Sequence, residues 1–136
     1  MVRIEVDYRG QLHTVCRHAP SGRELETDAP KDNRGRGESF SPTDLLATAL
    51  GSCMLTVMGI AARRHGWALE GVRARVDKHM ESEPVRRICR LQVELSMPAG
   101  LPAESREILE QSARGCPVMQ SISPSIEVDA RFDWGD

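Results

Sequence analysis

One stretch of the sequence is long, apolar on most of its circumference and punctuated at both ends: residues 41–66, SPTDLLATALGSCMLTVMGIAARRHG. Ser41 is a good N-cap, Pro42 suits the first helical position, and Asp44 stands three residues after the cap, as in a capping box. Gly66 follows three basic residues, which suit a helix C-terminus. We therefore predict one helix of about 36 Å, which is roughly the diameter of a domain of this size.

The apolar residues of this helix are spread around the helical wheel, so the helix needs cover on several sides. Gly51 and Gly59 each cost ~1 kcal/mol relative to alanine in mid-helix, and close approach of another backbone would compensate. One short chain has little material to wrap such a helix. We infer a homodimer in which the helix packs against its symmetry mate; a monomeric sandwich of helix and sheet is the alternative.

The composition predicts a single domain over residues 1–136, with 40% hydrophobic and 28% charged residues. A net charge of −2 and few aromatic residues argue against nucleic acid or an anionic membrane as partner. The N-terminus has no hydrophobic signal-peptide core and the long helix contains polar residues, so we expect a cytoplasmic protein and no membrane span. Because the cytoplasm keeps thiols reduced, the four cysteines indicate chemistry or packing and not a structural disulfide framework.

Segments of alternating apolar and polar residues predict β-strands on both sides of the long helix. The order of elements is three strands, the long helix, two strands, a helix and a strand, which is typical of an α+β fold with antiparallel sheet. A glycine-rich, aperiodic loop over 28–40 precedes the long helix and is long enough to line a site. The predicted strands are 2–8, 11–17, 23–27, 72–80, 87–97 and 125–134, and the second helix is 102–114.

The cysteines differ in their prospects for reactivity. Cys16 and Cys89 lie in predicted strands, where free cysteine usually behaves as a small buried hydrophobe. Cys53 lies in a buried helix, where a thiol is normally inert. Cys116 precedes Pro117 at a predicted helix N-cap, where unpaired N–H groups and the helix dipole would lower its pKa. From the residues alone, Cys116 is the stronger candidate for a reactive thiol, and a structural corner is the alternative.

Cys53 and Cys116 are 63 residues apart and the chain has no CxxC motif, which excludes a local redox turn and a compact zinc knuckle. The two thiols could meet only through tertiary structure. We expect no metal and no nucleotide or flavin cofactor, because the chain has no GxGxxG motif, no P-loop and no histidine pair at metal-ligand spacing. The four histidines are His13, His18, His65 and His79.

The run SPTDLLATALGSC, followed by CPV at residues 116–118, resembles the OsmC/Ohr family of thiol-dependent peroxidases. The order of elements is similar to that family's fold over nearly the whole chain. The resemblance implies an intertwined homodimer, with antiparallel sheets wrapped around long central helices, that reduces organic hydroperoxides. It implies that Cys53 is the peroxidatic nucleophile, that Cys116 resolves it as a disulfide, and that an external dithiol restores both thiols. The implied ranking of the two cysteines is the reverse of the ranking from the residues alone.

The chain departs from the family at one position. Well-studied members place a glutamate two residues into the helix motif, where it pairs with an arginine that activates the cysteine; this chain has Thr43 there. The carboxylate could come from Glu38 or Asp44, although a loop charge and a helix cap are the simpler interpretations of these two. The candidate arginines are Arg9, Arg34 and Arg36.

Two other functions stay open. The same fold could be a non-enzymatic module that binds a small hydrophobic ligand in a cleft at the dimer interface, with incidental cysteines. It could also be a thiol redox sensor whose disulfide forms but turns over slowly. The presence of two cysteines in the family's positions argues against the binding module, because packing alone would need only one.

Overall fold

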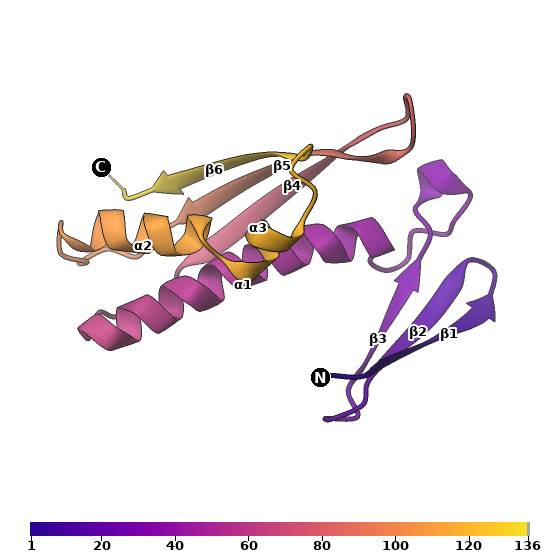
Figure 1. The fold of residues 1–136 in the computed structure, drawn as a ribbon, viewed down its shortest axis with the longest axis horizontal. Helices are drawn as coiled ribbons and strands as arrows, with labels where there is room; N and C mark the ends of the chain where they lie inside the picture. The colour runs from indigo at the N-terminus through magenta and orange to yellow at the C-terminus, as the bar shows by residue number, and fades with distance from the viewer. Residues whose placement is uncertain (136) are drawn as a thin grey trace. The chain divides into compact units, whose positions relative to one another are not determined.

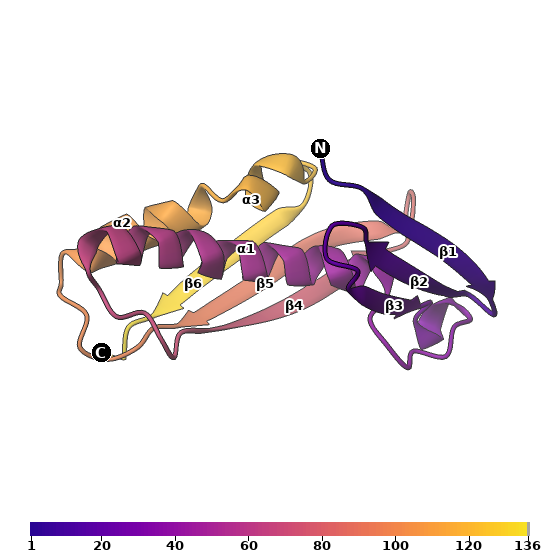
Figure 2. The same cartoon turned by 90° about the horizontal axis from the view of Figure 1, so that it is seen from below.

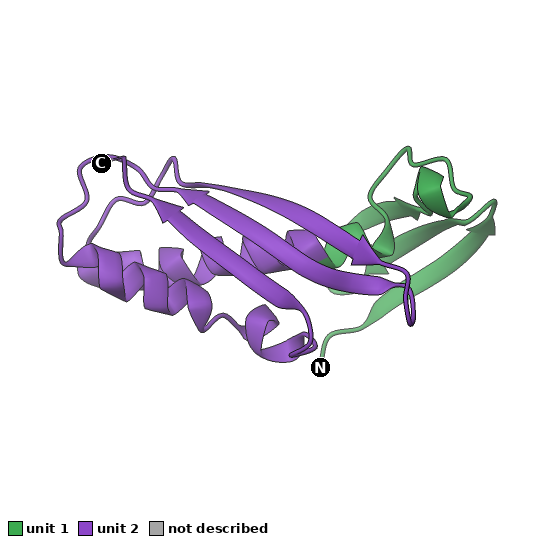
Figure 3. Cartoon of the chain, turned by 90° about the horizontal axis from the view of Figure 1, so that it is seen from above, with its two compact units in different colours: residues 1–46 green, residues 47–136 purple. Residues whose placement is uncertain are grey.

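The computed structural model describes residues 1–135; Asp136, the last residue of the predicted domain, lies outside the described residues. The chain divides into two compact units, Met1–Leu46 and Ala47–Asp136 (Figure 3). Each unit holds one three-stranded sheet. The long helix, α1 (Pro42–His65), crosses the boundary between the units. One domain over the whole chain therefore stays a prediction.

Unit 1 is an antiparallel meander of β1 (Ile4–Gly10), β2 (His13–His18) and β3 (Glu24–Asp28), in that order (Figure 1). The alternating pattern predicted these strands correctly. It predicted a half-buried first strand, however, and the apolar side chains of β1 are 60% to 65% exposed in the single chain. These side chains are Ile4, Val6 and Tyr8.

The predicted loop between β3 and α1 contains one short 3-10 turn, η1 (Lys31–Asn33). The loop folds back on the end of β3, because the Gly37 amide donates to the Ala29 carbonyl over 3.2 Å. Gly35 lies directly against Ala29, and a Cβ at that position would stand only 1.8 Å from the carbonyl oxygen. Only glycine fits this closure.

The capping box of α1 is confirmed. The Ser41 amide donates to Asp44 Oδ2 over 2.9 Å, and the Asp44 amide donates to Ser41 Oγ over 3.0 Å. At the other end, Gly66 adopts φ = 72° and the Trp67 amide donates to the Ala62 carbonyl over 2.9 Å. This left-handed closure satisfies a helix-end carbonyl, as the sequence predicted.

Unit 2 holds a sheet of β4 (Arg73–Glu81), β5 (Arg87–Ser96) and β6 (Glu127–Asp133), in that order. The α+β class is confirmed, with one departure from a purely antiparallel sheet. The β4/β5 hairpin is antiparallel, but β6 pairs with β5 in parallel. The reason is the connection through α2 (Ser105–Arg114) and α3 (Pro117–Ser121), which returns the chain to the starting end of β5.

The core of unit 2 lies between the sheet and the helices that cover one of its faces (Figures 1 and 2). Only one stripe of α1 is buried there. Gly51 lies on this stripe, where a Cβ would stand 2.8 Å from Val76 Cγ2, so the expected close approach is to a β4 side chain. Gly59 has nothing within 4 Å, and neighbouring Ile60 is 50% exposed. The buried stripe consists of Ala47, Leu50, Gly51, Met54, Met58 and Ala62.

By length and composition, α1 could cross a membrane: its most apolar window has a mean hydropathy of 1.9. One third of that window is buried inside the chain, and the core helix of a soluble protein passes the same test. The absence of a membrane partner stays a prediction.

Candidate active site

Cys116 lies at the corner between α2 and α3. The Gly115 amide closes α2 on the Gln111 carbonyl over 3.0 Å, and Pro117 begins α3. Cys116 is the N-cap of α3, as predicted, and its Sγ accepts a hydrogen bond of 3.4 Å from the Met119 amide. The side chain is completely buried.

Cys53 lies near the middle of α1, beside the buried stripe, and is half-buried. Cys53 lies close enough to the Cys116 thiol to raise its pKa, and both cysteines are free thiols. Tertiary structure within unit 2 thus brings together two thiols 63 residues apart in the chain. Proximity of the two residues is a requirement for a disulfide.

The predicted acidity of Cys116 is wrong in direction. Burial raises the pKa of the Cys116 thiol, the Met119 amide opposes this rise, and the hydrogen bond with Cys53 adds to it. The N-cap effect is present, but desolvation of the thiolate outweighs it. The raised pKa leaves the Cys116 thiol mostly protonated at neutral pH, and Cys53 is the more accessible of the two thiols.

The other two cysteines lie in strands and have different neighbours. Cys16 is half-buried in β2, opposite Val6 and Leu25. Cys89 is half-buried in β5, and its thiol donates to the His79 carbonyl over 3.3 Å. An irregularity in the β4/β5 register at this point turns Ile88 into the core in its place.

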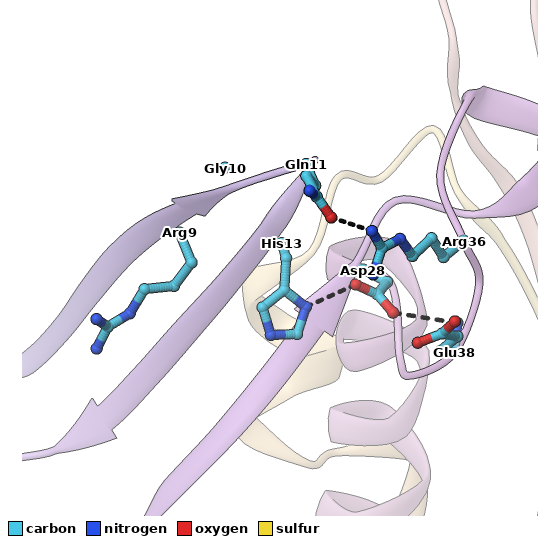
Figure 4. A pocket seen from close by; sticks show the side chains of 7 residues that line it. All are labelled: Arg9, Gly10, Gln11, His13, Asp28, Arg36 and Glu38. Atoms are coloured by element: carbon cyan, nitrogen blue, oxygen red, sulfur yellow. Dashed lines mark hydrogen bonds and ion pairs between the residues drawn. The ribbon is translucent and has the colours of Figure 1, made fainter.

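Arg9 and Glu38 both line a polar pocket of about 320 Å³ in unit 1 (Figure 4). Among the described residues, no hydrogen bond or ion pair joins these two side chains. Arg9 Nη2 lies 3.7 Å from Asp7 Oδ2, and both of these side chains are exposed. Because Arg9 and Glu38 belong to unit 1 and Cys53 to unit 2, their support of Cys53 stays a prediction.

The alternative candidates have other contacts. Asp44 serves the capping box of α1, which was its simpler interpretation. Arg36 lines the same pocket as Arg9, and its guanidinium donates to Gln11 Oε1. Arg34 is exposed and adopts φ = 67° after η1.

The pocket also contains a pair that the sequence analysis missed, His13 and Asp28 (Figure 4). These residues stand opposite each other on β2 and β3, and His13 Nδ1 lies 2.6 Å from Asp28 Oδ1. The sequence analysis considered His13 only as a metal ligand. The strand pairing could have predicted this pair, since a histidine and an aspartate at the adjoining ends of two predicted strands can meet across a hairpin.

Fold and site together define a class: an α+β protein in which a long helix carries one free thiol near a second thiol at the N-cap of a short helix. The model of the OsmC-like protein family matches residues 35–131. The chain therefore belongs to the OsmC-like family.

Solved structures agree with this assignment. A proposed osmotic stress induced and detoxification response protein of Psychrobacter arcticus is 42% identical, with a TM-score of 0.91, over 97% of this chain and 96% of its own. An organic hydroperoxide resistance protein, OsmC, of Legionella pneumophila is 18% identical, with a TM-score of 0.75, over 98% of this chain and 96% of its own. An organic hydroperoxide resistance protein from Elizabethkingia anophelis is 16% identical, with a TM-score of 0.75, over 99% of this chain and 96% of its own. The last two show the fold alone. A comparison with curated proteins gave no match.

Proposed function

We propose that this chain is a thiol-dependent peroxidase that reduces organic hydroperoxides through Cys53 and Cys116. The observation that carries the proposal is the proximity of these two free thiols, one half-buried and one completely buried. Membership of the OsmC-like family and the folds of proteins named for organic hydroperoxide resistance support a peroxide-related stress protein.

In the first step, the Cys53 thiolate attacks the outer oxygen of the hydroperoxide. The O–O bond breaks, Cys53 becomes a sulfenic acid, and the alkoxide leaves and takes up a proton to form the alcohol. Cys53 suits this step better than Cys116, because a substrate can reach a half-buried thiol more readily than a completely buried one.

In the second step, Cys116 attacks the Cys53 sulfenic acid, a disulfide forms, and water leaves. Cys116 must give up its proton for this attack, and the Met119 amide is placed to stabilise the resulting thiolate. An external dithiol then reduces the disulfide by thiol exchange and is itself oxidised to a disulfide. The balance of the cycle is one hydroperoxide and one dithiol converted to an alcohol, water and one disulfide.

We further propose that the working form is a homodimer in the cytoplasm. Two surfaces support a second copy: the exposed apolar face of β1, and a groove of about 670 Å³ with mixed polar and apolar lining along the C-terminal half of α1. The groove is lined in part by Gly59, Ile60 and Trp67. A second copy of α1 would cover the side of this helix that one chain leaves exposed. A reducing cytoplasm would return both cysteines to thiols.

The test is steady-state reduction of cumene hydroperoxide by the reduced protein with a dithiol, followed by peptide mapping of any crosslink. The proposal expects turnover and a Cys53–Cys116 disulfide after one equivalent of hydroperoxide. Cys53→Ser should remove both, and Cys116→Ser should remove the disulfide. Cys89→Ser is the matched control, because this half-buried thiol contacts a carbonyl and neither reactive cysteine.

The other two functions predict different results. A redox sensor would form the Cys53–Cys116 disulfide but show no steady-state turnover. A binding module would leave all four thiols unchanged and would retain an apolar ligand equally well in both serine variants. Survival of all four thiols after hydroperoxide treatment would refute the peroxidase.

A further inference from the structure

Asp28 is a buried carboxylate at the end of β3, with 4% of its surface exposed. A buried charge is unfavourable unless it is paired and hydrogen-bonded. Asp28 Oδ1 lies 2.6 Å from His13 Nδ1, and Asp28 Oδ2 accepts the Glu38 amide over 3.1 Å. The Asp28 amide also donates to the Phe40 carbonyl over 3.0 Å. One aspartate thus ties β2, β3 and the far end of the loop together (Figure 4).

Other contacts fasten the same loop at individual points. Ser39 Oγ donates to the Glu26 carbonyl over 3.0 Å, and Arg36 donates to Gln11 in the β1/β2 turn. These contacts fix individual points of the loop. The Asp28 carboxylate is the part that links the position of Glu38 to the histidine on β2.

His13 faces charges from every neighbouring segment. Asp28 raises its pKa, chiefly through their hydrogen bond, burial opposes this rise, and Glu26 on β3 adds to it. His13 in turn lowers the pKa of Asp28 through the same hydrogen bond, with a further contribution from the Glu38 amide. Arg36, Arg9 and Glu38 line the same pocket.

The directions of these two pKa shifts define the pH range in which the ion pair is formed. Because the folded pKa of His13 is raised, the stabilisation from its charged form is complete below about 6.5 and is lost as pH rises through the raised pKa. Because the folded pKa of Asp28 is lowered, the stabilisation from its charged form is present above about pH 3.9 and is lost as pH falls through the lowered pKa. The ion pair is therefore complete in mildly acidic solution and weakens in alkali.

We propose that His13 and Asp28 are a positioning pair that holds residues 37–40 against β3, and with them the Glu38 side chain on the pocket wall. The proposal rests on the proposed function only where it concerns a catalytic task of Glu38. The order of the loop itself is measurable without catalysis.

The experiment is hydrogen exchange of the full chain, read by mass spectrometry on peptides that cover residues 37–40. Asp28→Asn and His13→Gln should speed exchange there roughly three- to tenfold at about pH 6, the effect of losing one hydrogen bond or its charge. His18→Gln is the matched control, because His18 is exposed on the same strand and, among the described residues, its ring hydrogen-bonds only to Ser21 Oγ. It should leave the loop unchanged.

A pH series and a kinetic assay complete the test. After correction for intrinsic rates, loop exchange in the unaltered protein should rise with pH between about 6 and 9, and His13→Gln should remove this dependence. In the peroxidase assay, both variants should lower kcat/KM, with the defect of His13→Gln largest on the acid side. A merely structural role would not give this pH profile.

The outcomes separate the two proposals. Loop exchange in Asp28→Asn equal to that of the unaltered protein overturns the positioning pair, and His13→Gln decides the question if Asp28→Asn does not fold. Altered loop exchange in variants of a protein that shows no turnover refutes the peroxidase, but it supports the positioning pair. Turnover with altered loop exchange but an unchanged kcat/KM overturns the positioning role of the pair.

Discussion

Replacing Gly51 by alanine tests how α1 packs on β4. In mid-helix this change alone would stabilise the protein by about 1 kcal/mol. The new Cβ, however, would stand 2.8 Å from Val76 Cγ2, and the stiff β-branched valine has few rotamers with which to yield. Overpacking of this kind costs about 1 to 3 kcal/mol. We therefore expect Gly51→Ala to lower the free energy of unfolding by about 1 kcal/mol, within a range of about 0 to 2.

The assay is urea unfolding followed by circular dichroism, with Gly59→Ala as the matched control on the same helix. A Cβ at Gly59 has nothing within 4 Å, so in an isolated chain the control should gain about 1 kcal/mol. If a second copy of α1 packs there, the gain disappears and the unfolding midpoint depends on protein concentration. A Gly51→Ala variant more stable than the unaltered protein by about 1 kcal/mol would refute the packing of α1 on β4.

Three further predictions concern the thiol pair, the helix cap and the assembly. In single-turnover experiments, the disulfide-forming step should accelerate as pH rises above 7, because burial raises the pKa of Cys116; a rate that is flat between about pH 7 and 9 would contradict this. Asp44→Ala should lower the free energy of unfolding by about 0.5 to 2 kcal/mol through loss of the capping box, whereas Asp77→Ala, at an exposed position of β4, should change it by less than about 0.5 kcal/mol. Light scattering should give twice the chain mass of 15.1 kDa, and Val6→Lys should shift it to the single-chain value if the β1 face is an interface. An unshifted mass would place the interface elsewhere.

Local signals predicted the elements of this fold well, because each depends on neighbouring residues. The pattern of Ser41, Pro42 and Asp44 gave the start of α1, and the observed reciprocal hydrogen bonds are the physical form of that pattern. Gly66 ended the helix through a positive φ that other residues adopt at a cost. The parallel pairing of β6 could not be predicted in the same way, since it depends on how a connection of two helices returns the chain to β5.

Burial was harder to predict than secondary structure. The alternation in β1 correctly indicated a strand with one apolar face, yet alternation carries no information on what covers that face. The wheel of α1 similarly indicated a helix in need of cover on several sides, and the structure buries one stripe. In both elements the remaining apolar surface is consistent with the predicted homodimer, whose partner surface no single-chain pattern can identify.

The ranking of the two cysteines shows why local chemistry was insufficient at the site. The N-cap position of Cys116 was predicted correctly, and a donor amide does reach its sulfur. The predicted consequence failed because a capping amide contributes one partial charge, whereas complete burial removes the whole hydration of a thiolate. Resemblance to the family ranks Cys53 first, which stays a prediction, and the difference in burial between the two thiols is consistent with that order. A two-thiol cycle requires one thiol that a substrate can reach and a second that waits, protonated and protected, until the first is oxidised; the half-buried Cys53 and the buried Cys116 differ in just this way.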